Sequence, residues 1–256
     1  MQLWEKEQVY TLLPAIGVML ILAFVLHKTL GNKSEQIRRI PLQIITVILL
    51  GLEVVKQLCS ILKGYDLYHL PFHYCSLFLY VMPFMAFYKG KYKREVDAIG
   101  FSISSALFLL MLIYPGLIYS GYNVQQYFQD VFSFHTVTFH NLAMFGFLVI
   151  IVLKLHTPYK GDYKPVIGFM LLFSLVAAVM AQVLKTNYAN FYTCNIPPLE
   201  AVRLSVQAVL GKGVTQLLYV LIVAALQTAF TLMTYYLFCK LENIFAARKK
   251  AVNQAN

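Results

Sequence analysis

Hydrophobic residues fill most of the chain in long runs that short polar stretches separate. A membrane-spanning helix needs about 20 mostly apolar residues, and runs of that length predict an all-α, polytopic membrane protein with seven transmembrane helices. The predicted spans are roughly residues 8–27, 40–62, 70–88, 97–119, 133–154, 164–184 and 214–238. Because no repeat or second domain interrupts them, we expect residues 1–256 to form a single transmembrane domain.

Composition and charge agree with this class. Apolar residues make up 59% of the chain and charged residues 12%, with a mean hydropathy of +0.66, which excludes an ordinary soluble domain. Of the 21 lysines and arginines, 15 fall in the first, third and fifth loops and the C-terminal tail, against five in the N-terminus and the other loops. The positive-inside rule therefore predicts an outer N-terminus and a cytoplasmic C-terminus. The net charge of +10 then reflects topology, so membrane lipids are the expected partners and nucleic acid is not.

A second pattern concerns the third predicted span, residues 70–88. Pro71 is expected in its first turn, where the missing N–H of proline costs little. That start would place His73 and Cys75 about one turn into the membrane. It would also put His69 and His73 four residues apart on one helix face.

Polar residues of the predicted spans gather in their outer halves, while the inner halves are nearly all apolar. Small residues of the fourth span, such as Gly100 and Ser104, are suited to close helix packing. An outward-opening polar cavity is the simplest explanation, since polar groups within a membrane are costly. The residues expected to line it are Glu53, Lys56, Gln57, His69, His73, Cys75, His135, His140 and Asn141.

The sixth loop, residues 185–213, is the only long one. After Pro197 and Pro198 its apolar residues recur at helical spacing, and Gly211 follows as a C-cap. We predict a short amphipathic helix that lies on the outer surface or packs against the bundle.

The polar residues allow three kinds of chemistry. Cys75 could be a nucleophile if His140, at comparable depth, takes its proton; otherwise it is a small buried side chain or forms a disulfide with Cys194. His69 and His73 could instead supply two ligands of a zinc-dependent hydrolase, although no HExxH-like motif supports it. In a non-enzymatic alternative, Glu53, Lys56 and the histidines line a path for a solute or proton, unless Glu53 and Lys56 merely neutralise each other.

Three stretches carry a family resemblance: Leu70-Pro71-Phe72-His73-Tyr74-Cys75-Ser76, then Phe134-His135-Thr136-Val137-Thr138-Phe139-His140-Asn141, then Thr186-Asn187-Tyr188 with Pro197-Pro198. Together they resemble the YwaF-type bacterial integral membrane proteins, which look related to eukaryotic membrane enzymes that transfer fatty acyl groups onto ether lysophospholipids through a cysteine. One departure is Leu210-Gly211-Lys212-Gly213, where that family tends to have a Gly-Pro-Trp-Pro-like stretch.

The resemblance implies roles for individual residues. Cys75 would be the nucleophile and His140 the base, with His135 second to it. His73 and Asn187 would position groups or stabilise an oxyanion beside Tyr188. It also implies a multi-pass protein of the bacterial cytoplasmic membrane that acts on acyl chains with no cofactor or metal.

Overall fold

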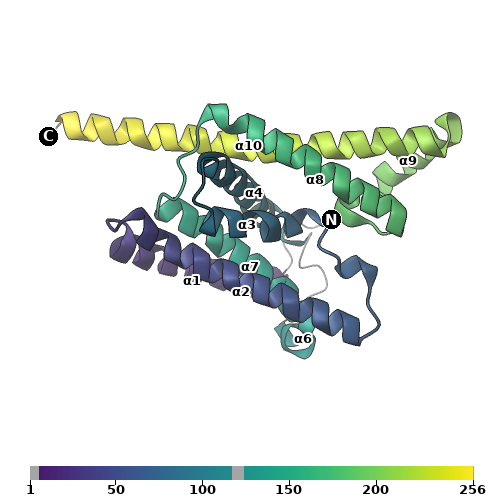
Figure 1. The fold of residues 1–256 in the computed structure, drawn as a ribbon, viewed down its shortest axis with the longest axis horizontal. Coiled ribbons are helices and arrows are strands. Elements are labelled where there is room, and N and C mark those ends of the chain that lie inside the picture. The colour runs from purple at the N-terminus through teal and green to yellow at the C-terminus, as the bar shows by residue number, and fades with distance from the viewer. Residues whose placement is uncertain (1–5, 117–123, 256) are drawn as a thin grey trace.

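The computed structural model describes residues 6–116 and 124–255. Within those ranges the chain is helical and contains no β-strand. In order, the elements are α1 (Lys6–Leu30), α2 (Glu35–Leu62), η1 (Leu67–His69), η2 (Tyr74–Ser76), α3 (Leu77–Phe87), α4 (Lys93–Ile113), α6 (Val124–Gln129), α7 (Val131–Val152), η3 (Lys160–Asp162), α8 (Tyr163–Leu184), η4 (Tyr188–Asn190), α9 (Pro197–Leu210) and α10 (Lys212–Ala255), where η marks a short 3-10 turn. Figure 1 shows α10 running along the length of the molecule, with α1 and α2 on the opposite side.

Six helices among the described residues are long and apolar enough to cross a membrane, so the chain is a multi-pass membrane protein. They are Gln8–Leu30, Glu35–Leu62, Lys93–Ile113, Val131–Val152, Lys160–Leu184 and Lys212–Ile244. Six of the seven predicted spans overlap them. The predicted 97–119 span is too long, because the helix ends at Ile113. Tyr114 precedes Pro115 and leaves the helical conformation, as residues before proline tend to do. Residues 117–119 lie outside the described residues.

The predicted span at residues 70–88 differs most from the structure. Its helical part is the short apolar stretch Tyr74–Phe87. The α-helix itself begins only at Leu77, after a 3-10 turn whose preceding residue, His73, is extended. Pro71 therefore lies before the helix and not in its first turn, so the expected start was wrong.

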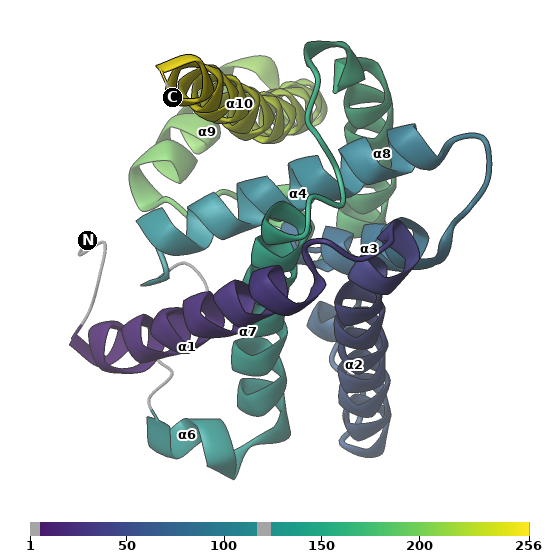
Figure 2. The ribbon, with the colours of Figure 1, turned by 90° about the vertical axis from the view of Figure 1, so that its left-hand side faces the viewer.

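Two groups of helices meet where α4 contacts α7. Helices α1, α2 and α6 pack on α7, whereas α8 and α10 pack on α4, and α3 lies between α2 and α4. Figure 2 shows α1 and α2 on one side of this crossing and α10 on the other. Small residues allow the close approach: Ser102, Ser104 and Ser105 are fully buried, and a Cβ on Gly100 would come within 2.5 Å of the Met85 sulfur.

The loops that carry most of the basic residues meet at one end of the bundle, around two buried carboxylates. Arg39 of α2 pairs with Asp97 of α4 at 2.8 Å and also donates to the Leu155 carbonyl. Arg94 pairs with Asp162 at 2.9 Å. The inner halves were expected to be nearly all apolar, but these buried carboxylates join the loops and α4 into one polar network.

His156 completes this network and should make stability depend on pH. Burial lowers the pKa of His156 to about 4, against an ordinary value of 6.5. The Asp162 carboxylate, 3.6 Å from Nε2, favours the charged imidazole, whereas the Arg94 charge disfavours it. Its Nε2 lies 3.2 Å from the hydroxyl of Tyr235, which donates to Asp162. Since the Tyr235 hydroxyl donates its hydrogen bond to Asp162, its oxygen accepts a hydrogen bond from the Nε2–H of a neutral His156.

Below pH 6.5 the unfolded chain binds a proton at this position that the folded protein does not. The free energy of unfolding should therefore fall as the pH decreases from about 6.5 towards 4, by on the order of 2–3 kcal/mol. Thermal unfolding in detergent across this range tests the effect, with His156→Gln as the variant that keeps a donor but cannot titrate there. An identical pH dependence in His156→Gln would rule out His156 as its source.

Candidate functional site

A network of polar side chains joins α2 to α7 at the end of the bundle opposite the buried carboxylates. Glu53 is its centre: one oxygen lies 2.7 Å from the Lys56 ammonium and accepts from Gln57 at 2.7 Å. Nε2 of His135 on α7 lies 3.1 Å from the other oxygen. All three charged or titratable side chains are nearly buried, with 11–13% of their surface exposed. Glu53 is thus held by both helices.

The same network extends to the turn that follows α2. Gln57 donates to the His69 backbone carbonyl at 2.8 Å and accepts from the Tyr65 hydroxyl at 2.6 Å. The His69 ring lies 2.7 Å from the Ser60 hydroxyl and stacks on Phe132 with ring centres 4.3 Å apart. These contacts fix the turn against α2 and the start of α7.

His69 and His73 do not form the shared face that a single helix would have given them. His73 Nε2 donates to the Tyr68 carbonyl at 3.0 Å, and its ring contacts Tyr68 and Tyr188. Their predicted pairing on one helix was therefore wrong. No group of three or more His, Cys, Asp or Glu side chains in the described parts of the chain is arranged to hold a metal ion.

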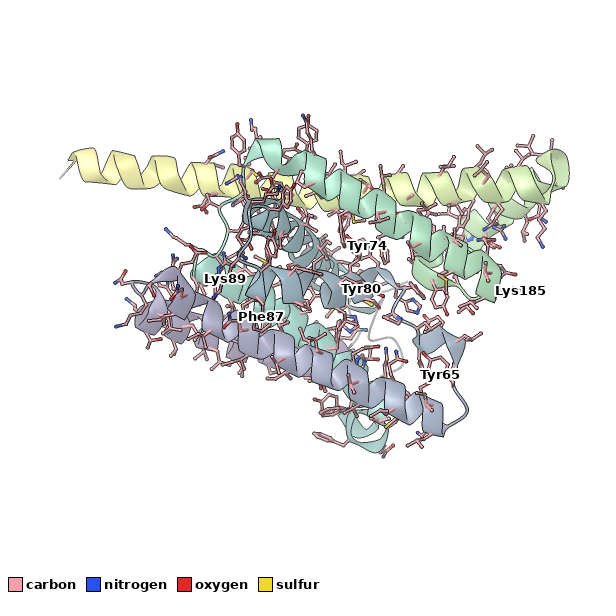
Figure 3. All side chains as sticks on the ribbon, viewed as in Figure 1. Tyr65, Tyr74, Tyr80, Phe87, Lys89 and Lys185 are labelled. Carbon is pink, nitrogen blue, oxygen red and sulfur yellow. The ribbon has the colours of Figure 1, made fainter. Side chains whose placement is uncertain are left out.

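Cys75 lies in the 3-10 turn that leads into α3. It is half-buried and free, as is Cys194, so the alternative of a disulfide between them does not hold in this structure. Its neighbours are anchored: the Tyr74 hydroxyl lies 2.7 Å from that of Thr231 on α10, and Tyr80 donates to the Pro71 carbonyl at 2.8 Å. Figure 3 shows Tyr74 and Tyr80 near one end of this segment and Phe87 towards the other. These contacts anchor the backbone on both sides of Cys75.

Lys56 connects Cys75 electrostatically to α7. Its ammonium is within electrostatic range of both the Cys75 thiol and the His140 ring, and His140 is also within range of His135. The ordinary pKa of a cysteine thiol is about 8.5. At neutral pH the resting group is therefore a thiol.

The hydrogen bond of His140 fixes its tautomer. Its Nδ1 lies 2.6 Å from the Thr136 backbone carbonyl, one turn earlier in α7. A carbonyl only accepts, so Nδ1 carries the proton and Nε2 carries the lone pair of the neutral ring. His140 is 5% exposed, and the next residue, Asn141, is half-buried on the same helix.

The segment after α8 holds the other predicted residues. The Asn187 side-chain oxygen accepts from the backbone N–H groups of Tyr192 and Thr193, both at 3.1 Å. Tyr188 is completely buried, and its hydroxyl donates to the Leu67 carbonyl beside η1. Asn187 thus folds its own loop, while Tyr188 connects that loop to the turn that carries His73.

Sequence reasoning missed the side chains that support this segment. Ala189 and Asn190 have positive φ angles of 47° and 61°. Gln227 and Tyr219 of α10 donate to their carbonyls, each at 2.7 Å. Such strain persists only where the surroundings enforce it. Gln227 could have been noticed, because an amide in the middle of a spanning helix needs a partner.

Comparison with known proteins yields one finding. A family model described as the TMEM164 family matches residues 3–238, nearly the whole chain. No curated protein and no solved structure matches. The resemblance to YwaF-type bacterial proteins was therefore wrong, because the matching family is named for eukaryotic transmembrane proteins. The expected bacterial membrane rested on the same resemblance and loses its support.

Proposed function

The chain belongs to the TMEM164 family of transmembrane proteins, and on that premise we propose that it is a membrane enzyme in which Cys75 carries fatty acyl groups between lipids. The substrate class is an ester-linked acyl chain of one lipid, and the acceptor is the free hydroxyl of a lysophospholipid.

We rest this proposal on the position of Lys56, which lies near both Cys75 and His140, and on the hydrogen bond that fixes the tautomer of His140. Lys56 is within electrostatic range of both Cys75 and His140. Because the resting thiol is protonated, a nucleophile here requires a base, and His140 Nε2 is the nitrogen able to accept the proton. The charge of Lys56 and the start of α3 directly after Ser76 both favour the thiolate once it forms.

The reaction has two balanced halves. His140 Nε2 takes the Cys75 proton, and the sulfur attacks the ester carbonyl of the donor lipid. The C–O bond breaks, the leaving alkoxide takes the proton from His140, and the acyl group remains as a thioester. His140 then accepts the proton of the lysophospholipid hydroxyl as its oxygen attacks the thioester. The C–S bond breaks, and Cys75 recovers its proton from His140.

The remaining predicted residues have supporting roles in this proposal. Glu53 orients His135 and fixes Lys56, whose charge stabilises the developing thiolate and oxyanion. Gln57 secures the turn before Cys75. His73 and Tyr188 form one wall beside that turn. Asn141 lies next to His140 on α7, and Asn187 folds the loop that carries Tyr188.

The distribution of basic residues favours an outer location for this site. The three loops and the tail that together carry 15 of the 21 lysines and arginines lie at the opposite end of the bundle, which the positive-inside rule places in the cytoplasm. Figure 1 shows the C-terminus at that far end. The polar network would then act on the outer leaflet, with α3 as a short seventh apolar segment.

The alternative of a solute or proton path has less support from the geometry. Glu53 is held by Lys56, Gln57 and His135, so its carboxylate is committed to contacts within the protein. A transport site would keep such a group available to its cargo.

Labelling with a thiol-directed, activity-based probe tests the proposal. Detergent-solubilised protein should react fastest at Cys75, and His140→Ala should slow this labelling at least about tenfold, because the base is lost. Cys59→Ala and Cys194→Ala are matched controls, since both remove a free, half-buried thiol and should leave Cys75 labelling unchanged. Equal, slow labelling of all thiols, whether or not His140 is present, would refute the proposal.

A further inference from the structure

A cleft of about 650 Å³ opens at the other end of the bundle, away from Cys75. It lies between α1 and α10, with α7 and α4 behind it. Its volume is within the range of small-molecule sites. This cleft is separate from the polar network around Glu53 and Cys75.

The walls of the cleft are apolar and exposed. Leu20 and Phe24 of α1 face Ile151 of α7, and Leu241 of α10 lies across the opening. Phe24 is 60% exposed and Leu20 52%, although both belong to a spanning helix. In a membrane, such surfaces are covered by hydrocarbon chains.

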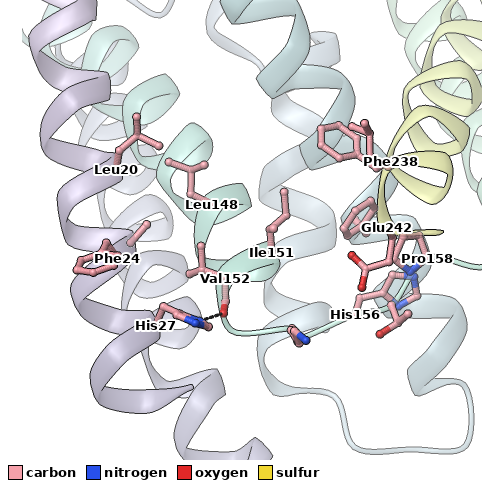
Figure 4. A pocket seen from close by; sticks show the side chains of 15 residues that line it. Leu20, Phe24, His27, Leu148, Ile151, Val152, His156, Pro158, Phe238 and Glu242 are labelled. Carbon is pink, nitrogen blue, oxygen red and sulfur yellow. Dashed lines mark hydrogen bonds between the residues drawn. The ribbon is translucent and has the colours of Figure 1, made fainter. Parts of the chain in front are cut away.

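The mouth of the cleft is polar and carries both signs of charge. His27 and Lys154 supply basic groups on the α1 and α7 side, and Glu242 supplies a carboxylate on the α10 side. Figure 4 shows His27 and Glu242 on opposite sides, with Ile151 and Val152 between them. Among the ion pairs of the described residues, none includes Lys154 or Glu242. The two charges thus lie apart, and neither forms an ion pair with another described side chain.

His27 is fixed at the mouth of the cleft by a hydrogen bond to α7. Its Nδ1 lies 2.9 Å from the Val152 carbonyl, so Nδ1 is the donor and Nε2 is directed elsewhere. Lys154 follows the end of α7 with a positive φ of 50°, which turns the chain away from the helix. His27 and Lys154 therefore lie at the ends of α1 and α7, beside the loops that the positive-inside rule assigns to the cytoplasm.

We propose that this cleft binds one zwitterionic glycerophospholipid. An acyl chain lies between α1 and α10, the phosphate contacts the Lys154 ammonium, and the ammonium of the headgroup pairs with Glu242. A phosphate alone would suit the basic side, but the carboxylate across the mouth disfavours a lipid with net negative charge. The site does not involve Cys75 and stands independently of acyl transfer.

Native mass spectrometry of the full chain in mild detergent tests this site. Dioleoyl phosphatidylethanolamine, phosphatidylcholine and phosphatidylglycerol are the probes. We expect one retained phosphatidylethanolamine or phosphatidylcholine per chain, with at least tenfold weaker retention of phosphatidylglycerol. Glu242→Gln should abolish this preference, and Lys154→Asn should weaken retention of all three. Asparagine is chosen because it tolerates the positive φ.

Two further variants separate specific binding from general lipid adhesion. Ile151→Trp fills the apolar wall and should reduce retention of every lipid while leaving Cys75 labelling intact. Lys33→Asn removes a basic group from the loop between α1 and α2, outside the cleft, and should change nothing. Equal retention in all variants, or tighter retention of phosphatidylglycerol in the unmodified protein, would overturn the proposal.

Discussion

Cys75→Ala is expected to reduce acyl transfer by at least about 10³-fold, the largest effect on activity of any single change. The variant lacks the sulfur that would hold the acyl group, and the other free cysteines lie elsewhere: Cys59 on α2, Cys194 in the loop before α9 and Cys239 on α10. Without the nucleophile the thioester cannot form, so the effect is larger than the loss of one contact that stabilises the transition state. Protein in lipid vesicles, supplied with a labelled lysophospholipid, gives the rate by mass spectrometry of the acylated product.

The control must separate chemistry from folding. Cys75→Ser keeps the size of the side chain, so we expect it to fold. Its transfer rate should lie below that of the unmodified protein and above that of Cys75→Ala, because the serine oxygen is a weaker nucleophile. Cys59→Ala is the matched thiol control and should keep full activity. His140→Ala should lose about 10²- to 10⁴-fold, as for a general base, and more than His135→Ala. Unchanged transfer in Cys75→Ala would exclude the thioester mechanism.

The membrane helices could be predicted from sequence because each depends on local composition. A run of about 20 apolar residues forms a helix in a membrane almost regardless of its neighbours, since every backbone group must be bonded. The stretch at residues 70–88 is different. Its first residues make contacts to other elements, such as Tyr80 to the Pro71 carbonyl and His73 to the Tyr68 carbonyl. These contacts stabilise an extended segment where proline statistics predicted a helix start.

The candidate site was predictable in its members but not in their pairing. That Glu53, His135 and Cys75 lie towards one end follows from counting residues along each span. The contact between Glu53 and Lys56 is local, since they lie one turn apart on α2, and the sequence already offered it as an alternative. The contact between Glu53 and His135 depends on how α2 packs against α7, which no local pattern encodes. The buried carboxylates at the opposite end were missed for a similar reason. Asp97 lies near the start of α4, and only the fold brings Arg39 to it.

Asp97→Ala is expected to cause the largest loss of stability, about 3–5 kcal/mol in the free energy of unfolding. Asp97 is 5% exposed and pairs with Arg39 at 2.8 Å and with Lys93 at 2.6 Å. Removing its carboxylate leaves both cations near the protein interior with only Glu35, an exposed partner, to compensate. An uncompensated buried charge is far more costly than a missing surface pair. Thermal unfolding in mild detergent, with reversibility checked, measures the difference.

Two comparisons show whether the cost comes from the unpaired charges. Glu35→Gln removes the exposed member of the network, whose side chain is 61% accessible, and should cost less than about 1 kcal/mol. The double variant Arg39→Met with Asp97→Leu removes the main pair together, so it should be more stable than Asp97→Ala, because desolvation of the pair offsets much of its attraction. If the double variant were as unstable as Asp97→Ala, lost hydrogen bonds to the Met85 and Leu155 carbonyls would explain the effect better than charge.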